Sequence, residues 1–135
     1  MKLSDIVVDS KSVWVDFEGV PGFKVEINYV PRTEMSAMIK GCQKSEYNKK
    51  LKSIEMKLDE DKFIRKLVEK SIKDWKGLTP TKVNEHFVPV NVTPENADQE
   101  MEFDVDSAVV LIKESSDFDD WLNERISDID SFRTK

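Results

Sequence analysis

Residues 58–78, LDEDKFIRKLVEKSIKDWKGL, are the most strongly patterned stretch of this 135-residue sequence and decide the fold that we expect. Their apolar side chains recur at spacings of three and four, as on one face of an amphipathic helix: Phe63, Ile64, Leu67, Val68, Ile72 and Trp75. Asp59 is placed as the N-cap, and the acids Glu60 and Asp61 suit the positive end of the helix dipole. Gly77 fits a left-handed C-terminal cap. We therefore predict one continuous helix that ends at Gly77 and buries Trp75.

A β-hairpin is predicted upstream of this helix. Apolar and polar residues alternate in residues 13–18 (VWVDFE) and again in residues 23–29 (FKVEINY), which is the period of a half-buried strand. Between them, Pro21 suits the first central position of a type II turn, and Gly22 suits the second, which requires a positive φ. An isolated two-stranded hairpin is marginal in water, so we expect its apolar face to pack on the helices that follow.

The segment between the hairpin and residue 58 is less clearly patterned. Thr33 is predicted to cap a helix that has four apolar side chains on one face: Met35, Met38, Ile39 and Cys42. Residues 43–57 contain five lysines and show only weak periodicity. The alternation of Ile54, Met56 and Leu58 fits either a short strand or an extended linker, and both alternatives stay open.

The last third of the chain predicts two short helices after a long connection over residues 79–103, which has room for a brief strand around residues 86–92. Asp104 or Asp106 can cap the first helix, which buries Ala108, Val109, Leu111 and Ile112. Ser115 or Ser116 can cap the second, which aligns Phe118, Trp121, Leu122, Ile126 and Ile129, with Phe132 just beyond them. The fold expected is a single α+β domain over residues 1–135. Its N-terminal β-hairpin packs on about four α-helices, and it is predominantly helical.

The net charge of −6 is unevenly distributed along the chain. Residues 32–94 carry fourteen bases and nine acids, whereas residues 95–135 carry four bases and thirteen acids. The two blocks either attract each other within one fold or contact a partner. An acidic protein without a cluster of Lys, Arg and aromatic residues is a poor candidate for binding nucleic acid, so no nucleic-acid partner is expected.

The sequence points to a cytoplasmic protein without membrane contact. Its longest apolar run, residues 108–112, is far shorter than the roughly 20 residues that cross a bilayer. The first ten residues contain acids where a signal peptide needs an apolar stretch. The single cysteine, Cys42, suits a reducing compartment.

No motif for catalysis, cofactor binding or metal binding stands out. The four glycines are scattered singly, so no loop can cradle a phosphate. Cys42 and His86 are interpreted as a core thiol and a packed loop residue rather than as nucleophile and base. The acids from Asp117 to Asp120 lack the glycine and glutamate that a calcium loop requires, and they suit a helix start instead. We expect a protein that is not an enzyme.

Three phrases taken together resemble the tail assembly chaperones of long-tailed, siphovirus-type bacteriophages and related prophages. The first is the predicted helix 58–78 with its ending DWKGL, since members of that family commonly end this helix in a similar Trp-x-Gly-Leu. The second is MEFDVDSAVVLIKES (101–115), an acidic and apolar phrase that leads into a helix. The third is the closing helix with its acidic tail, DFDDWLNERISDIDSFR (117–133). The resemblance spans residues 12–133, and the lysine-rich segment 44–57 departs from it.

The resemblance implies a non-catalytic chaperone in the host bacterial cytoplasm, which binds the phage tape measure protein and promotes tail tube assembly, and which is absent from the mature virion. It also implies a second form, extended at the C-terminus by a programmed frameshift, that recruits the tail tube protein. Weak self-association into oligomers or a helical array is expected as well. The alternative is a minor structural protein of the phage tail or head–tail junction.

Phe118, Trp121 and Leu122 are the candidate partner-binding residues. They lie at one turn's spacing on the closing helix, where they either belong to the core or line a groove that accepts a helix of the client. The core interpretation is favoured for Trp121, and both interpretations stay open for Phe118.

Overall fold

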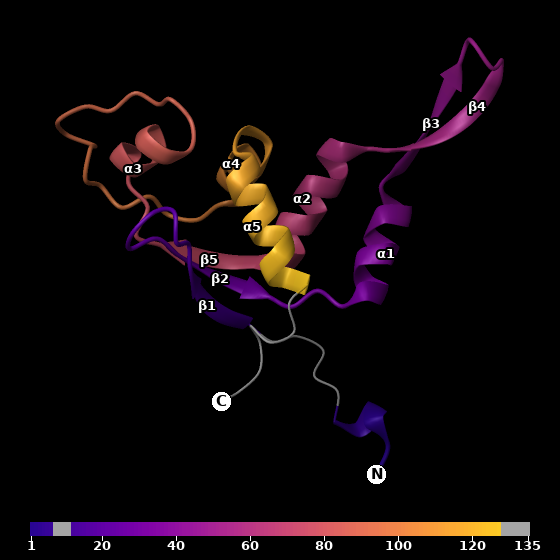
Figure 1. Cartoon of the computed structure of the whole chain (residues 1–135), viewed down its shortest axis with the longest axis horizontal. Helices are drawn as coiled ribbons and strands as arrows, with labels where there is room; N and C mark the ends of the chain where they lie inside the picture. Colours follow the sequence, from indigo (N-terminus) through magenta and orange to yellow (C-terminus); the bar gives the residue numbers. More distant parts are fainter. Residues whose placement is uncertain (7–11, 128–135) are drawn as a thin grey trace.

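The computed structural model describes residues 1–6 and 12–127. In chain order their elements are η1 (Leu3–Asp5), β1 (Ser12–Asp16), β2 (Lys24–Asn28), α1 (Arg32–Gly41), β3 (Gln43–Asn48), β4 (Ser53–Leu58), α2 (Glu60–Ser71), β5 (Ile72–Lys76), α3 (Pro80–His86), α4 (Val105–Glu114) and α5 (Ser116–Ser127). The chain is 44% helical and 22% strand, so the expected α+β class is confirmed. Helices α2, α4 and α5 lie over the sheet, and β3 and β4 project from the body (Figure 1).

The N-terminal hairpin is confirmed. β1 and β2 pair in antiparallel register from Ser12 opposite Asn28 to Asp16 opposite Lys24. The turn between them is closed by a hydrogen bond from the Phe17 amide to the Phe23 carbonyl oxygen at 2.9 Å. The side chains of Phe23, Val25 and Ile27 are fully buried, so the hairpin packs its apolar face on the helices as the alternation predicts.

The single helix predicted to end at Gly77 is wrong from Ile72 onward. The Asp59 cap is confirmed, because its carboxylate accepts the Lys62 amide at 3.3 Å. The helix ends at Ser71, whose buried hydroxyl donates to the Leu67 carbonyl oxygen at 2.5 Å and competes with the helix ladder. Residues Ile72–Lys76 form β5 instead, which pairs antiparallel with β2 and makes the sheet order β1-β2-β5.

A β-bulge explains why the sequence pattern is helical where the structure is a strand. In β5, Trp75 lies opposite Val25 and Ile72 lies opposite Ile27, so β5 has one more residue than β2 between these two pairs. The extra residue puts Ile72 and Trp75 on the same buried face although they are three positions apart. A spacing of three is also a helical spacing, so the two structures share one apolar pattern.

The N-terminus of α1 differs from the prediction. Pro31 precedes the helix and no side chain caps it, so Thr33 lies inside the first turn instead of at the cap. Met38 and Cys42 are buried as expected, whereas Ile39 is exposed. Pro31 has no amide of its own to satisfy, and its carbonyl oxygen accepts the Met35 amide at 3.0 Å as the helix begins.

The segment 43–58 is an antiparallel hairpin, so the strand alternative for Ile54 to Leu58 is confirmed. The tip of this second hairpin is tied by Asn48, whose side-chain oxygen accepts the amides of Lys50 and Leu51 at 2.9 and 3.1 Å. At the base, the Asp59 amide donates to the Cys42 carbonyl oxygen at 2.6 Å. These hydrogen bonds fix a two-stranded element that leaves the body of the molecule (Figure 1).

The connection over residues 79–103 contains α3, which is capped by the Thr79 hydroxyl at 3.3 Å from the Lys82 amide. The brief strand predicted around residues 86–92 is wrong, because the chain leaves α3 as an irregular loop. The loop is held by local hydrogen bonds of turns and not by pairing with another strand. One of these bonds runs from the Asn96 amide to the Thr93 hydroxyl at 3.2 Å.

The two closing helices agree with the sequence. The Asp104 carboxylate caps α4 by accepting the Ser107 amide at 2.7 Å, and the Ser115 hydroxyl accepts the Phe118 amide at the start of α5. Both helices bury the residues that the spacing predicts: Ala108, Val109, Leu111, Ile112, Phe118, Trp121, Leu122 and Ile126. Ile129 and Phe132 lie outside the described residues.

Candidate partner-binding site

The three candidate residues of α5 lie in the core. Phe118 and Leu122 are 0% exposed and Trp121 is 9% exposed. Phe17, from the hairpin turn, packs against two of them, with ring centroids 5.8 Å from Phe118 and 5.3 Å from Trp121. The structure therefore brings the three together, but as an aromatic and aliphatic cluster that holds α5 to the sheet, and not as the wall of an open groove.

Trp121 also lines a shallow cavity of about 270 Å³ between the hairpin turn and α3, together with Glu18, His86 and Asp117. The cavity holds neither a serine nor a cysteine, and Cys42 lines a different cavity beside α1. The Cys42 thiol and the His86 ring are therefore not neighbours. Across residues 1–6 and 12–127, no three His, Cys, Asp or Glu side chains converge as a metal site would require.

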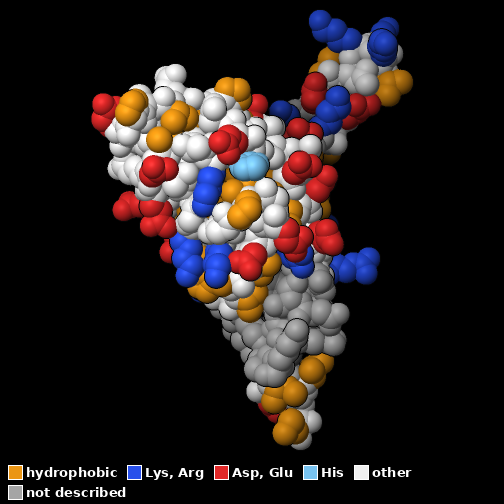
Figure 2. Space-filling model, turned by 60° about the vertical axis from the view of Figure 1, so that its left-hand side comes forward, with side chains coloured by type: hydrophobic (Ala, Val, Ile, Leu, Met, Phe, Trp, Pro, Cys, Tyr) orange, Lys and Arg blue, Asp and Glu red, His pale blue; other side chains and the backbone are white. Residues whose placement is uncertain are grey.

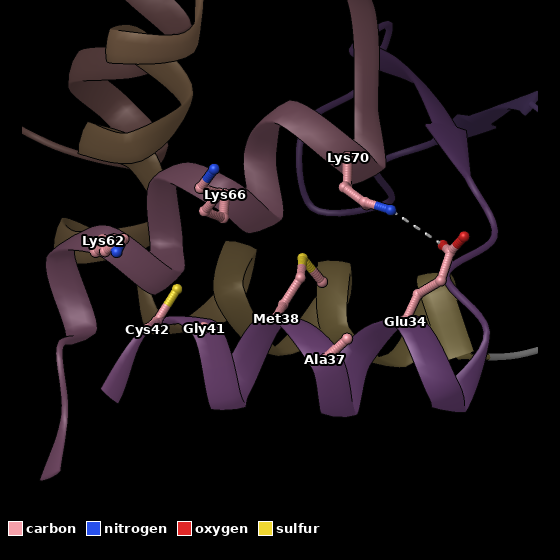
Figure 3. A pocket seen from close by; sticks show the side chains of 8 residues that line it. All are labelled: Glu34, Ala37, Met38, Gly41, Cys42, Lys62, Lys66 and Lys70. Atoms are coloured by element: carbon pink, nitrogen blue, oxygen red, sulfur yellow. Dashed lines mark ion pairs between the residues drawn. The ribbon is translucent and has the colours of Figure 1, made fainter. Parts of the chain in front are cut away.

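A groove of about 370 Å³ separates α1 from α2 (Figure 3). Its α2 wall carries Lys62, Lys66 and Lys70, one lysine per turn, and its α1 wall carries small or sulfur-containing residues. The Lys70 ammonium pairs with the Glu34 carboxylate at 3.6 Å and closes one end. This groove is basic with an apolar floor.

A second groove of about 530 Å³ lies between α2, α4 and α5. Its apolar floor consists of Phe63, Ile64, Leu67 and Ile112, and its rim carries Glu60, Asp61, Lys113, Asp119 and Asn123. We call this set of residues the acidic groove. The Lys113 ammonium pairs with the Asp61 carboxylate at 2.5 Å, so three carboxylates face one ammonium around the rim.

The two rim carboxyls that titrate abnormally do so for opposite reasons. Burial raises the pKa of Asp119 above its ordinary value, and the neighbouring charge of Asp120 adds to this, whereas a hydrogen bond from Asn123 acts against it. The hydrogen bond from Lys113 and its positive charge lower the pKa of the exposed Asp61. The acidic groove thus holds one partly desolvated carboxyl, Asp119, that forms no ion pair with a cation of the described residues.

Several large apolar side chains are exposed on the hairpin Gln43–Leu58, which we call the arm. Residues directly opposite each other in an antiparallel pair project to the same face. Tyr47 faces Ile54, and Ser45 faces Met56, so these pairs form one mostly apolar face. Tyr47, Ile54 and Met56 are 59%, 72% and 61% exposed, and we call these three side chains the arm face.

The opposite face of the arm is charged. It carries the pairs Lys44 with Lys57 and Glu46 with Glu55, and the tip adds further lysines. Figure 2 shows blue Lys and Arg atoms at the end of this projecting segment, and further blue atoms on the body. In the sequence, the alternation of Ile54, Met56 and Leu58 was the only signal of the arm, because its first strand, QKSEYN, has a single aromatic residue.

Within the part of the chain that the structure describes, no helix is long and apolar enough to cross a membrane. Comparison of the chain with protein-family models, with curated proteins and with solved structures gave no match.

Proposed function

We propose that this protein is a non-catalytic tail assembly chaperone of a long-tailed phage or prophage, and that it binds the tape measure protein in the infected cell. The observation that carries the proposal is the arm face. The body has its own closed core, and yet three large apolar side chains project into solvent on a separate element. Such surfaces are typical of protein–protein contact.

The chemistry of the arm suits a long helical client. A tape measure protein presents extended apolar stripes that aggregate unless they are covered, and the arm face offers an apolar patch, the Tyr47–Ile54 pair and Met56, that extends about 7 Å along the strands. The lysines of the arm add attraction to acidic client segments. The resemblance of residues 12–133 to the tail assembly chaperones supports the same function, and under this proposal a longer frameshift form brings in the tail tube protein.

Co-expression with the tape measure protein tests the proposal. The intact chain raises the soluble yield of the client and co-purifies with it. The double variant Ile54→Asp, Met56→Asp loses both effects, because two charges replace the apolar arm face. Val110→Asp is the matched control, since Val110 is 47% exposed on α4, away from the arm, and this variant retains both effects. A client that stays insoluble with the intact chain, in short and extended forms, would rule the function out.

Mass spectrometry of purified virions separates the chaperone from a minor structural protein of the tail or head–tail junction. A chaperone acts before the particle is complete, so the protein is expected to be missing from virions while it is present in the infected cell. Its presence in virions in a fixed ratio to the tail proteins would favour the structural alternative.

A further inference from the structure

The arm has an apolar face that the body does not cover. A two-stranded hairpin is marginal in water on its own and gains stability when its apolar face packs on another surface. Ile54 and Met56 are more exposed than any apolar side chain of α2, α4 or α5. The arm therefore has the properties of an element that is stabilised when a partner covers its apolar face.

The acidic groove complements the arm in both charge and polarity. The tip of the arm carries the three lysines Lys49, Lys50 and Lys52, and the groove rim carries three carboxylates and one ammonium. The arm face is apolar, and so is the floor formed by Phe63, Ile64, Leu67 and Ile112. Asp119 at the rim is partly desolvated and forms no ion pair within residues 1–6 and 12–127, so a lysine at the tip of the arm would supply a positive charge beside it.

The arm cannot readily occupy the acidic groove of its own chain. Leu58, the last arm residue, already lines one end of that groove, and the arm leads away from the body beyond this point (Figure 1). The base is held by the hydrogen bond from the Asp59 amide to the Cys42 carbonyl oxygen. Folding the arm back would break this hydrogen bond. An arm that lies in the groove therefore comes from a second copy of the chain.

We propose that the arm of one copy lies in the acidic groove of a second copy. Tyr47, Ile54 and Met56 pack on the apolar floor, and the tip lysines Lys49, Lys50 and Lys52 reach Glu60 and Asp119 at the rim. Arm and groove are different surfaces of the same chain, so the contact either closes by reciprocal exchange in a dimer or continues from copy to copy.

This contact stands on the geometry of the chain alone and does not require the proposed client. The two proposals share the arm face, so under both of them a bound client competes with the neighbouring copy for it. An experiment on the purified protein without client therefore tests the arm-to-groove contact separately from the chaperone function.

Two variants with complementary defects test the contact by sedimentation velocity. The arm variant Ile54→Asp, Met56→Asp keeps an intact groove, and the groove variant Glu60→Lys, Asp119→Lys keeps an intact arm. All four positions lie at the surface or rim, so each variant should retain the circular dichroism spectrum of the wild type. Each variant alone should associate at least tenfold more weakly than the wild type.

An equimolar mixture of the two variants is the decisive sample. One intact arm and one intact groove remain available, so the mixture should form a one-to-one dimer and no larger species, whereas the wild type associates further or forms reciprocal dimers. Association should weaken as salt rises past about 0.15 M, where the screening length is near 8 Å. Val110→Asp should associate as the wild type does.

Three results would overturn the proposal. The first is a wild type that stays monomeric at every concentration. The second is an arm variant that associates as strongly as the wild type, which would place the contact elsewhere. The third is a mixture of the two variants that stays monomeric although the wild type associates, which would show that arm and groove do not contact each other.

Discussion

Gly77 lies so close to Gly22 that a Cβ atom on Gly77 would be 1.9 Å from the Gly22 carbonyl oxygen. Both residues have positive φ angles, +82° at Gly77 and +84° at Gly22. Gly22 belongs to the turn of the first hairpin and Gly77 follows β5, so their contact joins the turn to the end of the neighbouring strand. The Gly77 amide donates to Glu100 at 2.9 Å, and its carbonyl oxygen accepts the Lys82 ammonium at 2.8 Å.

Replacing Gly77 by alanine should therefore destabilise the fold by about 2 to 5 kcal/mol, since a left-handed conformation and a backbone clash add together. Gly41→Ala is the matched control. A Cβ atom at Gly41 meets nothing within 4 Å, and the residue ends α1, so this change should be neutral or stabilise by up to about 1 kcal/mol. Urea denaturation measures both. Equal effects of the two changes would mean that the backbones of Gly22 and Gly77 are not in contact.

Trp75→Ala should cost about 3 to 5 kcal/mol of unfolding free energy, as large-to-small core changes do. The Trp75 ring is 3% exposed and lies 5.1 Å from the Phe103 ring, and its indole N–H donates to the Met101 carbonyl oxygen at 3.1 Å. Trp14→Ala is the control, since the Trp14 ring is 43% exposed and lies beneath the Lys76 ammonium. This change should lower the unfolding free energy by about 1 kcal/mol or less. A loss under about 1 kcal/mol for Trp75→Ala would place this ring at the surface and make it a partner-binding candidate.

Phe118→Asp should unfold the protein, so it is not a test of client binding. A carboxylate at this fully buried position would be desolvated, and the substitution removes the ring packing against Phe17. Together these costs exceed about 4 kcal/mol, out of a typical total stability of about 5 to 15 kcal/mol. Phe118→Leu keeps an apolar side chain and should cost only about 1 to 2 kcal/mol. Thermal melting followed by circular dichroism distinguishes the two. A cooperative melt for Phe118→Asp near the wild-type midpoint would contradict the buried placement.

The acidic groove gives a pH dependence of opposite sign at its two titrating carboxyls. Burial raises the pKa of Asp119 above its ordinary value of 3.8. The stability that this carboxyl contributes to the folded protein is therefore present below pH 3.8 and is lost as pH rises through the folded pKa. Lys113 lowers the pKa of Asp61, so its contribution is present above 3.8 and is lost as pH falls through the folded pKa.

The unfolding free energy of Asp119→Asn minus that of the wild type should therefore be larger at about pH 7 than at about pH 3. For Asp61→Asn, the same difference should be smaller at about pH 7 than at about pH 3. Urea denaturation at the two pH values, with both variants beside the wild type, measures these differences. The same sign of pH dependence for the two variants would show that the rim carboxyls have similar environments.

The sequence by itself determined the features that depend on near neighbours in the chain. The alternation on either side of Pro21 and Gly22 specifies the first hairpin, because strand period and turn chemistry are both local. The cap Asp59 was identifiable for the same reason, and Asp104 and Ser115 were each one of two candidates, since a cap reaches amides only two or three residues away.

Only the tertiary structure decided the state of residues 72–76 and the role of the arm. The apolar spacing of Ile72 and Trp75 fits a helix or a bulged strand equally well, and the open edge of β2, which lies more than forty residues earlier in the chain, selects the strand. The arm was similarly ambiguous, because its first strand is polar and its pairing joins residues up to fifteen positions apart. Burial of Phe118 and Trp121 also depends on a distant residue, Phe17. Local patterns fix which surfaces of an element are apolar, whereas long-range pairing fixes what those surfaces meet.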